Sequence, residues 1–226
     1  MNRFVALDLE TTGLDRENDE PIEAALVRFV DGKPGESVSL LVRPKSPLRP
    51  FIAALTGIPR EELDAAPEFA EVADRLSAFV GSDPIVAYNA AMDRLFLEKA
   101  YAQAGKPAPA VAWIDALVPA RMAWPRLANH KLETVVEHLG LEGDGAHRAL
   151  PDAMRAGEVF VAALAELDAR GVRPGVLAKG TPFEAVFPAP AEGETPEWKP
   201  ISPEFPAVAE CEPPAAELEG PCSDNN

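Results

Sequence analysis

The segment at residues 4–13 constrains this chain of 226 residues more than any other part of its sequence. Its apolar run predicts a strand over residues 3–9, followed by a turn at Gly13. Asp8 and Glu10 point to the same face of that strand, because side chains alternate along it. Two ionised carboxylates there repel each other unless water solvates both or a cation lies between them. A divalent ion such as Mg2+ or Mn2+ prefers such oxygen ligands.

The hydrophobic pattern of the rest of the chain predicts an α/β fold. A meander of three antiparallel strands, with a turn at residues 32–35, comes before short strands that alternate with helices. The predicted strands are residues 3–9, 22–30, 37–42, 85–88 and 111–114. The predicted helices are residues 51–55, a helix that begins at Pro67, 91–103, 117–123, 131–139 and 150–169. This order indicates a mixed sheet flanked by helices.

Composition limits the classes of protein that fit. The chain is 47% hydrophobic, enough for a core, but no apolar run is long enough to span a bilayer and no signal-peptide pattern is visible. Cys211 and Cys222 match no metal-binding spacing, so we expect free thiols and a cytoplasmic protein. The net charge of −16 disfavours a protein that grips nucleic acid by a broad basic surface.

The sequence changes character after residue 180. Residues 181–226 hold ten prolines, ten acidic residues and one base, Lys199, which gives that segment a charge of 1 − 10 = −9. Such a segment cannot bury enough apolar surface to offset the entropy of ordering it. We therefore expect a folded body over residues 1–170, a linker at 171–180 and a disordered, acidic, proline-rich tail at 181–226.

Two further acidic positions stand at the starts of predicted helices. Asp93 follows Asn89 by four positions and lies on the first turn after a strand, where a carboxylate also complements the helix dipole. Pro151 suits a first helical turn, which places Asp152 near the start of the last long helix. His147 precedes that helix, where it is either an exposed loop histidine or a base that accepts a proton from water.

Five residues in a fixed order carry a resemblance to a known family. They are Asp8, Glu10, Asp93, His147 and Asp152. Their order and spacing resemble the DEDD 3′–5′ exonucleases, in particular the DEDDh branch, which is the DnaQ-like family. The resemblance covers residues 3–169, with supporting matches at residues 10–14, 55–58 and 129–132. It implies a ribonuclease H-like fold and an exonuclease domain over residues 1–170.

The resemblance also implies a role for each residue that matches the family pattern. Asp8, Glu10 and Asp152 would hold one Mg2+, while Asp8 and Asp93 would hold a second, with Mn2+ as the alternative ion. His147 would act as the general base that deprotonates the attacking water. The substrate-binding residues implied for the terminal nucleotide are Thr11, Thr12, Leu14, Thr56 and Asn89.

Three functions follow as alternatives. The first is a metal-dependent exonuclease that acts on 3′ ends of DNA, with single strands favoured, in repair or proofreading. The second is an RNA-directed relative, since discrimination depends on contacts to the 2′-hydroxyl that sequence alone does not place. The third is a non-catalytic module that docks a protein partner through the tail at residues 181–226. The sequence leaves the oligomeric state open.

Overall fold

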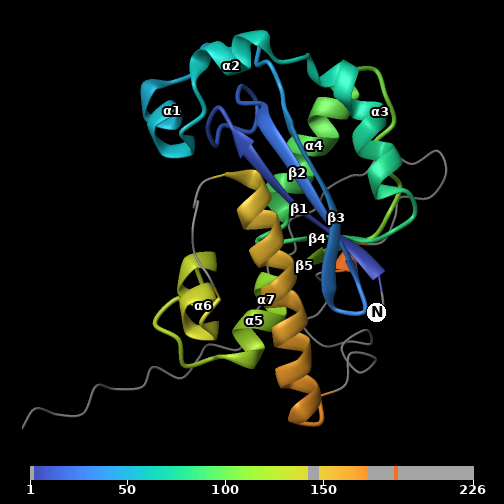
Figure 1. The fold of residues 1–226 in the computed structure, drawn as a ribbon, viewed down its shortest axis with the longest axis vertical. Coiled ribbons are helices and arrows are strands. Elements are labelled where there is room, and N and C mark those ends of the chain that lie inside the picture. Colours follow the sequence, from blue (N-terminus) through green and yellow to red (C-terminus); the bar gives the residue numbers. More distant parts are fainter. Residues whose placement is uncertain (1–2, 142–147, 173–185, 188–226) are drawn as a thin grey trace, which may run out of the picture.

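The computed structural model describes residues 3–141, 148–172 and 186–187. A mixed sheet of order β3-β2-β1-β4-β5-β6 forms the centre, and helices cover both faces (Figure 1). Its strands are β1 (Arg3–Thr11), β2 (Pro21–Val30), β3 (Lys33–Leu41), β4 (Ile85–Ala87), β5 (Trp113–Asp115) and β6 (Val186–Phe187). The helices are α1 (Pro50–Thr56), α2 (Arg60–Ala65), α3 (Phe69–Val80), α4 (Ala91–Gln103), α5 (Leu117–Ala123), α6 (Leu132–Leu139) and α7 (Ala149–Ala169).

The first three strands form the predicted antiparallel meander, and β1, β4 and β5 are parallel to one another. The prediction of a turn at residues 32–35 was wrong in its position. The hairpin turns at Asp31 and Gly32, whose φ angles are 51° and 76°, and β3 already begins at Lys33. Two residues with positive φ form the kind of tight turn that matches the twist of paired strands.

Alternation along β1 divides the core between the two faces of the sheet. Val5 and Leu7 pack with α3 and α4, whereas Phe4 and Ala6 pack with α7. The ring of Phe4 stacks on Phe29 with centroids 4.8 Å apart. Asp8 and Glu10 continue the even-numbered series, so both carboxylates lie on the face that α7 covers.

The predicted helices agree with the structure to within one residue at each end, except at the start of α3 and at α2. The helix predicted to begin at Pro67 begins at Phe69, because Glu68 and Glu71 form a reciprocal capping box that fixes its start. The short helix α2 was missed; its six residues bury only Leu63, which leaves no hydrophobic period to detect.

Most of the expected linker and tail lies outside the residues that the structure describes. The exceptions are residues 171–172 and β6, whose Val186 and Phe187 pair antiparallel with Ile114 and Trp113 of β5. Val186 and Phe187 differ from the expectation of disorder throughout the segment, because their backbone extends the sheet at its edge. Among the described residues, no helix is long and apolar enough to cross a membrane.

Candidate active site

Three carboxylates meet where β1 ends and α7 begins. Asp8 and Glu10 come from the last residues of β1, and Asp152 comes from the first turn of α7. One oxygen atom of each lies within 4.8 Å of the others, and all three residues are half-buried. The structure thus brings Asp152 to two acids that lie more than 140 positions earlier in the sequence, as the resemblance to the DEDD exonucleases implies.

The fourth acid, Asp93, reaches the same strand from α4. β4 pairs with β1 at Val5 and Ala6, in the first half of that strand. Further along β1, the amide of Leu9 donates a hydrogen bond to Asp93 Oδ1 at 3.2 Å. Asp93 therefore lies beside Asp8, although it is not one of the three acids whose oxygens cluster within 4.8 Å.

Burial and mutual repulsion make these acids difficult to ionise together. Burial, then repulsion by Asp152, raises the pKa of Glu10 to about 7. Burial also raises the pKa of Asp93 to about 7. The pKa of Asp8 lies well above its ordinary range, because of burial first and repulsion by Asp93 second. A divalent cation would remove this repulsion, so the donor set fits a metal ion that prefers oxygen.

Two charged residues beside the cluster were missed by sequence reasoning. Arg155, one turn further along α7, donates to Asp152 Oδ1 at 3.0 Å. Glu23 lies directly across from Glu10 in the β1–β2 ladder and is only 1% exposed. Burial alone would raise the pKa of Glu23, but hydrogen bonds from Arg148, Ser39 and the Ala149 amide outweigh it and lower that pKa. Glu23 is the only acid in β2 and is flanked by apolar residues, and this was the signal available for it.

The loop after β1 is tied to α1 through a buried acid. Asp19 accepts a hydrogen bond from the hydroxyl of Thr12 at 2.8 Å. It also forms an ion pair of 2.8 Å with Arg49, at the start of α1. A Cβ on Gly13 would lie 2.3 Å from an oxygen of Asp19, so this close approach requires glycine. Leu14, the next residue, is 78% exposed.

The predicted substrate-binding residues are placed in different ways. The amide of Thr12 donates to the carbonyl of Glu20 at 2.9 Å, and the hydroxyl of Thr11 donates to the carbonyl of Gly13 at 2.7 Å. The buried hydroxyl of Thr56 donates to the carbonyl of Ile52 at 3.0 Å. These groups are therefore engaged within the protein, and the roles assigned to them stay predictions.

Asn89 occupies the turn between β4 and α4 with φ of 63°, a conformation that few side chains other than asparagine adopt easily. Its amide donates to Asp115 Oδ1 at 2.9 Å, and its side chain is exposed. This turn aims the first residues of α4, including Asp93, at the end of β1. His147 lies outside the described residues.

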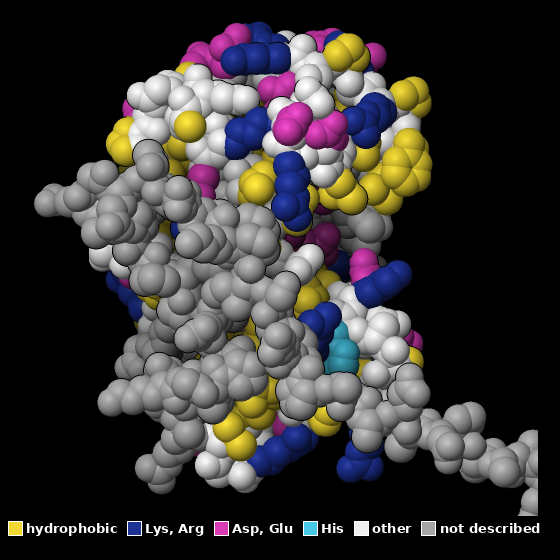
Figure 2. Space-filling model, turned by 180° about the vertical axis from the view of Figure 1, so that it is seen from behind, with side chains coloured by type: hydrophobic (Ala, Val, Ile, Leu, Met, Phe, Trp, Pro, Cys, Tyr) yellow, Lys and Arg dark blue, Asp and Glu magenta, His cyan; other side chains and the backbone are white. Residues whose placement is uncertain are grey.

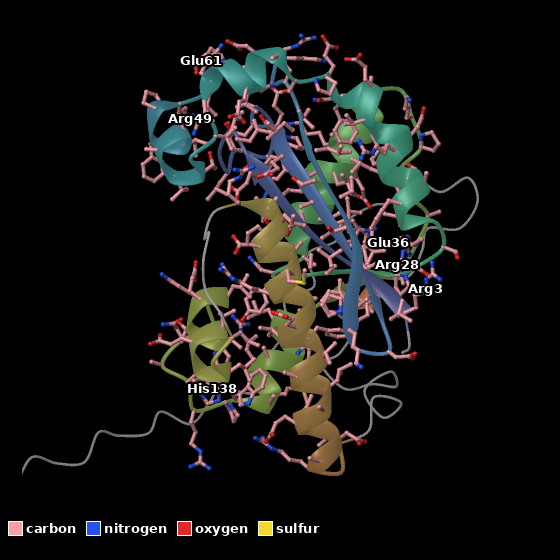
Figure 3. The ribbon with its side chains drawn as sticks, in the orientation of Figure 1. Arg3, Arg28, Glu36, Arg49, Glu61 and His138 are labelled. Carbon is pink, nitrogen blue, oxygen red and sulfur yellow. The ribbon has the colours of Figure 1, made fainter. Side chains whose placement is uncertain are left out.

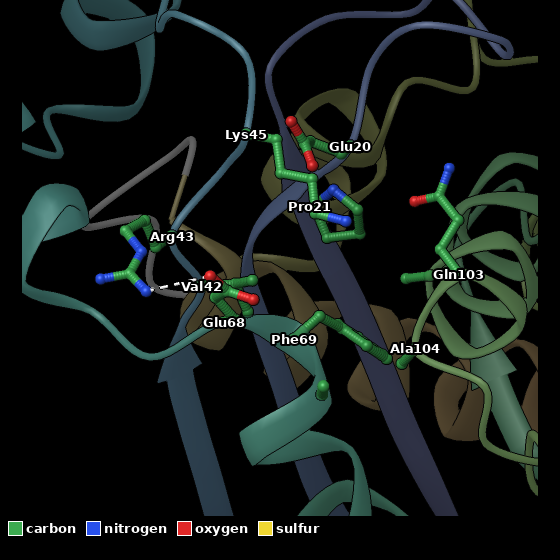
Figure 4. Close-up of a pocket in the computed structure, with 11 residues that line it drawn as sticks. Glu20, Pro21, Val42, Arg43, Lys45, Glu68, Phe69, Gln103 and Ala104 are labelled. Carbon is green, nitrogen blue, oxygen red and sulfur yellow. Dashed lines mark hydrogen bonds and ion pairs between the residues drawn. The ribbon is translucent and has the colours of Figure 1, made fainter.

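A separate cavity of about 150 Å³ lies on the α3–α4 face of the sheet (Figure 4). An ion pair of 3.2 Å between Arg43 and Glu68 lines it, together with Phe69 and Gln103. None of the predicted site residues that the structure describes lines this cavity, and α7 covers the acids on the opposite face. The acid cluster is thus distinct from this pocket.

Comparisons with known proteins agree with this fold and site. The model of the RNase T exonuclease family matches residues 5–160. The chain is 35% identical over 164 residues to the DNA polymerase III subunit epsilon of Aquifex aeolicus, covering 73% of this chain and 81% of that protein. A solved structure of exonuclease X in complex with 5′-overhanging duplex DNA is 27% identical, with a TM-score of 0.59, over 76% of this chain and 93% of that one.

The fold and the acid cluster define an exonuclease of the DEDD type. The chain belongs to the RNase T exonuclease family, and its resemblance to the DnaQ-like DEDDh exonucleases is confirmed. It is also 35% identical over 159 residues to the DNA polymerase III PolC-type protein of Clostridium perfringens. That match covers 70% of this chain but only 11% of the length of that relative.

Proposed function

We propose that this chain is a metal-dependent 3′–5′ exonuclease that hydrolyses DNA from its 3′ end. The observation that carries the proposal is the cluster of Asp8, Glu10 and Asp152, whose oxygens lie within 4.8 Å of one another. Two Mg2+ ions, or Mn2+ ions, would activate a water molecule and stabilise the departing 3′-oxygen. Family membership supports the reaction class.

Each acid has a distinct task in this proposal. Asp8, Glu10 and Asp152 would hold one ion, and Asp8 and Asp93 would hold the other. The hydrogen bond from the Leu9 amide orients the Asp93 carboxylate, and the guanidinium of Arg155 orients that of Asp152. His147, five positions before Asp152, takes the proton from the attacking water.

The end of a DNA strand is the substrate we propose. Exposed apolar side chains near the site support contact with an unpaired terminal base: Leu14 is 78% exposed, and Phe51 on α1 is 72% exposed. Figure 2 shows hydrophobic side chains gathered at the edge of the molecule where α1 lies. Two relatives are named as DNA polymerase III proteins, which supports DNA rather than RNA as the substrate proposed for this chain. Thr11, Thr12, Thr56 and Asn89 complete the proposed pocket.

The setting we propose is cytoplasmic repair or proofreading. Single-stranded 3′ ends are the favoured substrate, because a chain with a net charge of −16 depends on its metals and on base contacts rather than on a basic surface along a duplex. The acidic tail at residues 181–226 is the part of the chain through which a protein partner would dock.

A rate comparison on matched substrates tests the proposal. Purified protein is mixed with 5′-labelled DNA and RNA oligomers of the same sequence, with Mg2+, with Mn2+ and with EDTA. Metal-dependent release of mononucleotides, faster from DNA, supports the proposal. Faster release from RNA would assign the chain to the RNA-directed alternative, and no release with either metal would contradict an exonuclease.

A further inference from the structure

We infer that Glu23 is a positioning residue for the acid cluster: together with Arg148, it clamps the first turn of α7 against β2 and so holds Asp152 beside Asp8 and Glu10. The inference rests on the proposed function of the cluster as a metal centre. It adds a residue that neither the family pattern nor the spacing of acids in the sequence assigned.

Both carboxylate oxygens of Glu23 accept two hydrogen bonds each. Its Oε2 accepts hydrogen bonds from Arg148 Nε at 3.0 Å and from the Ala149 amide at 3.2 Å. Its Oε1 accepts from Arg148 Nη2 at 3.0 Å and from the hydroxyl of Ser39 at 2.7 Å. The pairing with Arg148 is bidentate, which fixes direction as well as distance. With both oxygens engaged in this way, Glu23 serves as an anchor rather than as a further metal ligand.

Glu23 provides the N-terminal cap that the N-cap residue of α7 does not provide. Arg148 is the N-cap residue of α7, and its side chain makes no capping hydrogen bond within the helix. The carboxylate of Glu23 instead accepts the Ala149 amide from a neighbouring strand, and it places a negative charge at the electropositive end of the helix. The direction in which α7 leaves the sheet is therefore set by β2.

Glu23 and Arg148 are both close in the structure to the acids of the proposed metal site. Glu23 of β2 lies opposite Glu10 of β1 in the strand register. Along the helix, the amide of Asp152 donates to the carbonyl of Arg148 at 3.3 Å, so the two residues stand one turn apart. A shift of the first turn of α7 would move Asp152 relative to the two acids on β1. Partners of this kind, one shell away from a metal, typically change metal affinity by about 10–100-fold when removed.

A matched pair of variants separates positioning from simple stability. Glu23→Gln removes the charge of the clamp. Asp83→Asn removes the charge of another partly buried acid, which pairs with Arg3 and Arg28 at the far end of the sheet. Figure 3 shows Arg3 and Arg28 together at that end, and Arg49 beside α1 at the other. Both variants lose a charged pair, but only Glu23→Gln touches α7.

The decisive measurement is Mn2+ binding by titration calorimetry without nucleic acid, beside the free energy of unfolding in urea. We expect Glu23→Gln to weaken Mn2+ binding by about tenfold or more, and Asp83→Asn to leave it unchanged while both lose stability. Cleavage by Glu23→Gln should show a reduced kcat that recovers in part at high metal concentration, with KM for the oligomer unchanged.

Two outcomes overturn different claims. If the wild type binds Mn2+ and Glu23→Gln binds it equally well, the clamp is purely structural and the inference is wrong. If the wild type itself binds no Mn2+, the proposed function fails instead. Should Glu23→Gln not fold, Arg148→Gln tests the same contact from the exposed side and is held to the same tenfold criterion.

Discussion

The amide of Leu9 donates a hydrogen bond of 3.2 Å to the carboxylate of Asp93, and this bond ties the start of α4 to β1 between Asp8 and Glu10. The side chain of Asp93 thus accepts a backbone hydrogen bond from β1 beyond the residues of that strand that pair with β4. The orientation of Asp93 is fixed by the protein's own backbone. Two substitutions can therefore separate its charge from its hydrogen bond.

Asp93→Asn should abolish cleavage without loss of stability, since the amide oxygen still accepts from Leu9 and a repelling charge is gone. Asp93→Ala should abolish cleavage and also destabilise by about 1–3 kcal/mol, because the Leu9 amide loses its partner. Urea unfolding and a cleavage assay on both variants check this. Equal stability of the two variants would show that the hydrogen bond contributes nothing.

The stability of the metal-free protein should fall as pH rises. Folding raises the pKa of Glu10 from 4.5 to about 7. The folded state then holds this proton more tightly than the unfolded state, so the stability it contributes is full below about pH 4.5 and is lost as pH rises through about 7. Unfolding in urea with EDTA, from about pH 5 to about pH 8, measures the fall.

Glu10→Gln is the control for that pH dependence. Its glutamine does not titrate, so its profile should be flatter than that of the wild type over the same range. Mn2+ should restore the stability of the wild type at high pH, because it binds the folded state with its carboxylates ionised. Superimposable profiles of the two proteins in EDTA would contradict the raised pKa of Glu10.

Gly157→Ala should destabilise the protein, although alanine favours a helix more than glycine does. A Cβ at this position of α7 would lie 2.2 Å from Cε2 of Phe29, so the helix could no longer approach the sheet as closely. Overpacking costs about 1–3 kcal/mol and should outweigh the gain of about 1 kcal/mol in helix propensity. Thermal or urea unfolding checks the sign, and the double variant Phe29→Leu/Gly157→Ala should recover part of the loss.

Substitutions at Asn89 separate the effect of its positive φ on folding from the proposed contact of its side chain with the terminal nucleotide. Its φ of 63° suits glycine, so Asn89→Gly should keep the fold, whereas Asn89→Ala should cost about 1–2 kcal/mol. If the asparagine side chain binds the terminal nucleotide as proposed, both variants should raise KM to a similar extent. An unchanged KM for Asn89→Gly would remove Asn89 from the substrate site.

The parts of the structure that rest on local pattern were predictable from the sequence. The strand that carries Asp8 and Glu10, the helix with Asp93 on its first turn, and the last helix beginning close to Asp152 all follow from apolar periodicity and from turn residues. The resemblance to the DEDD exonucleases then implied that these acids meet, and the oxygens of Asp8, Glu10 and Asp152 do cluster.

Contacts between distant side chains were not predictable. The pairing of Glu23 with Arg148 joins residues 125 positions apart, and nothing local in either segment specifies its partner. The hydrogen bonds that engage Thr12 and Thr56 depend equally on tertiary placement, because a hydroxyl in a sequence motif shows no preference between substrate and protein until the fold is known.

The most direct test of the central claim is a gel assay of the purified protein on 5′-labelled single-stranded DNA with Mg2+. Asp8→Ala and His147→Ala are run beside the wild type, with Asp83→Asn as the control remote from the site. A ladder that shortens from the 3′ end, is abolished by Asp8→Ala, is strongly slowed by His147→Ala and is retained by Asp83→Asn is the predicted result. A ladder that survives Asp8→Ala would contradict catalysis at the acid cluster.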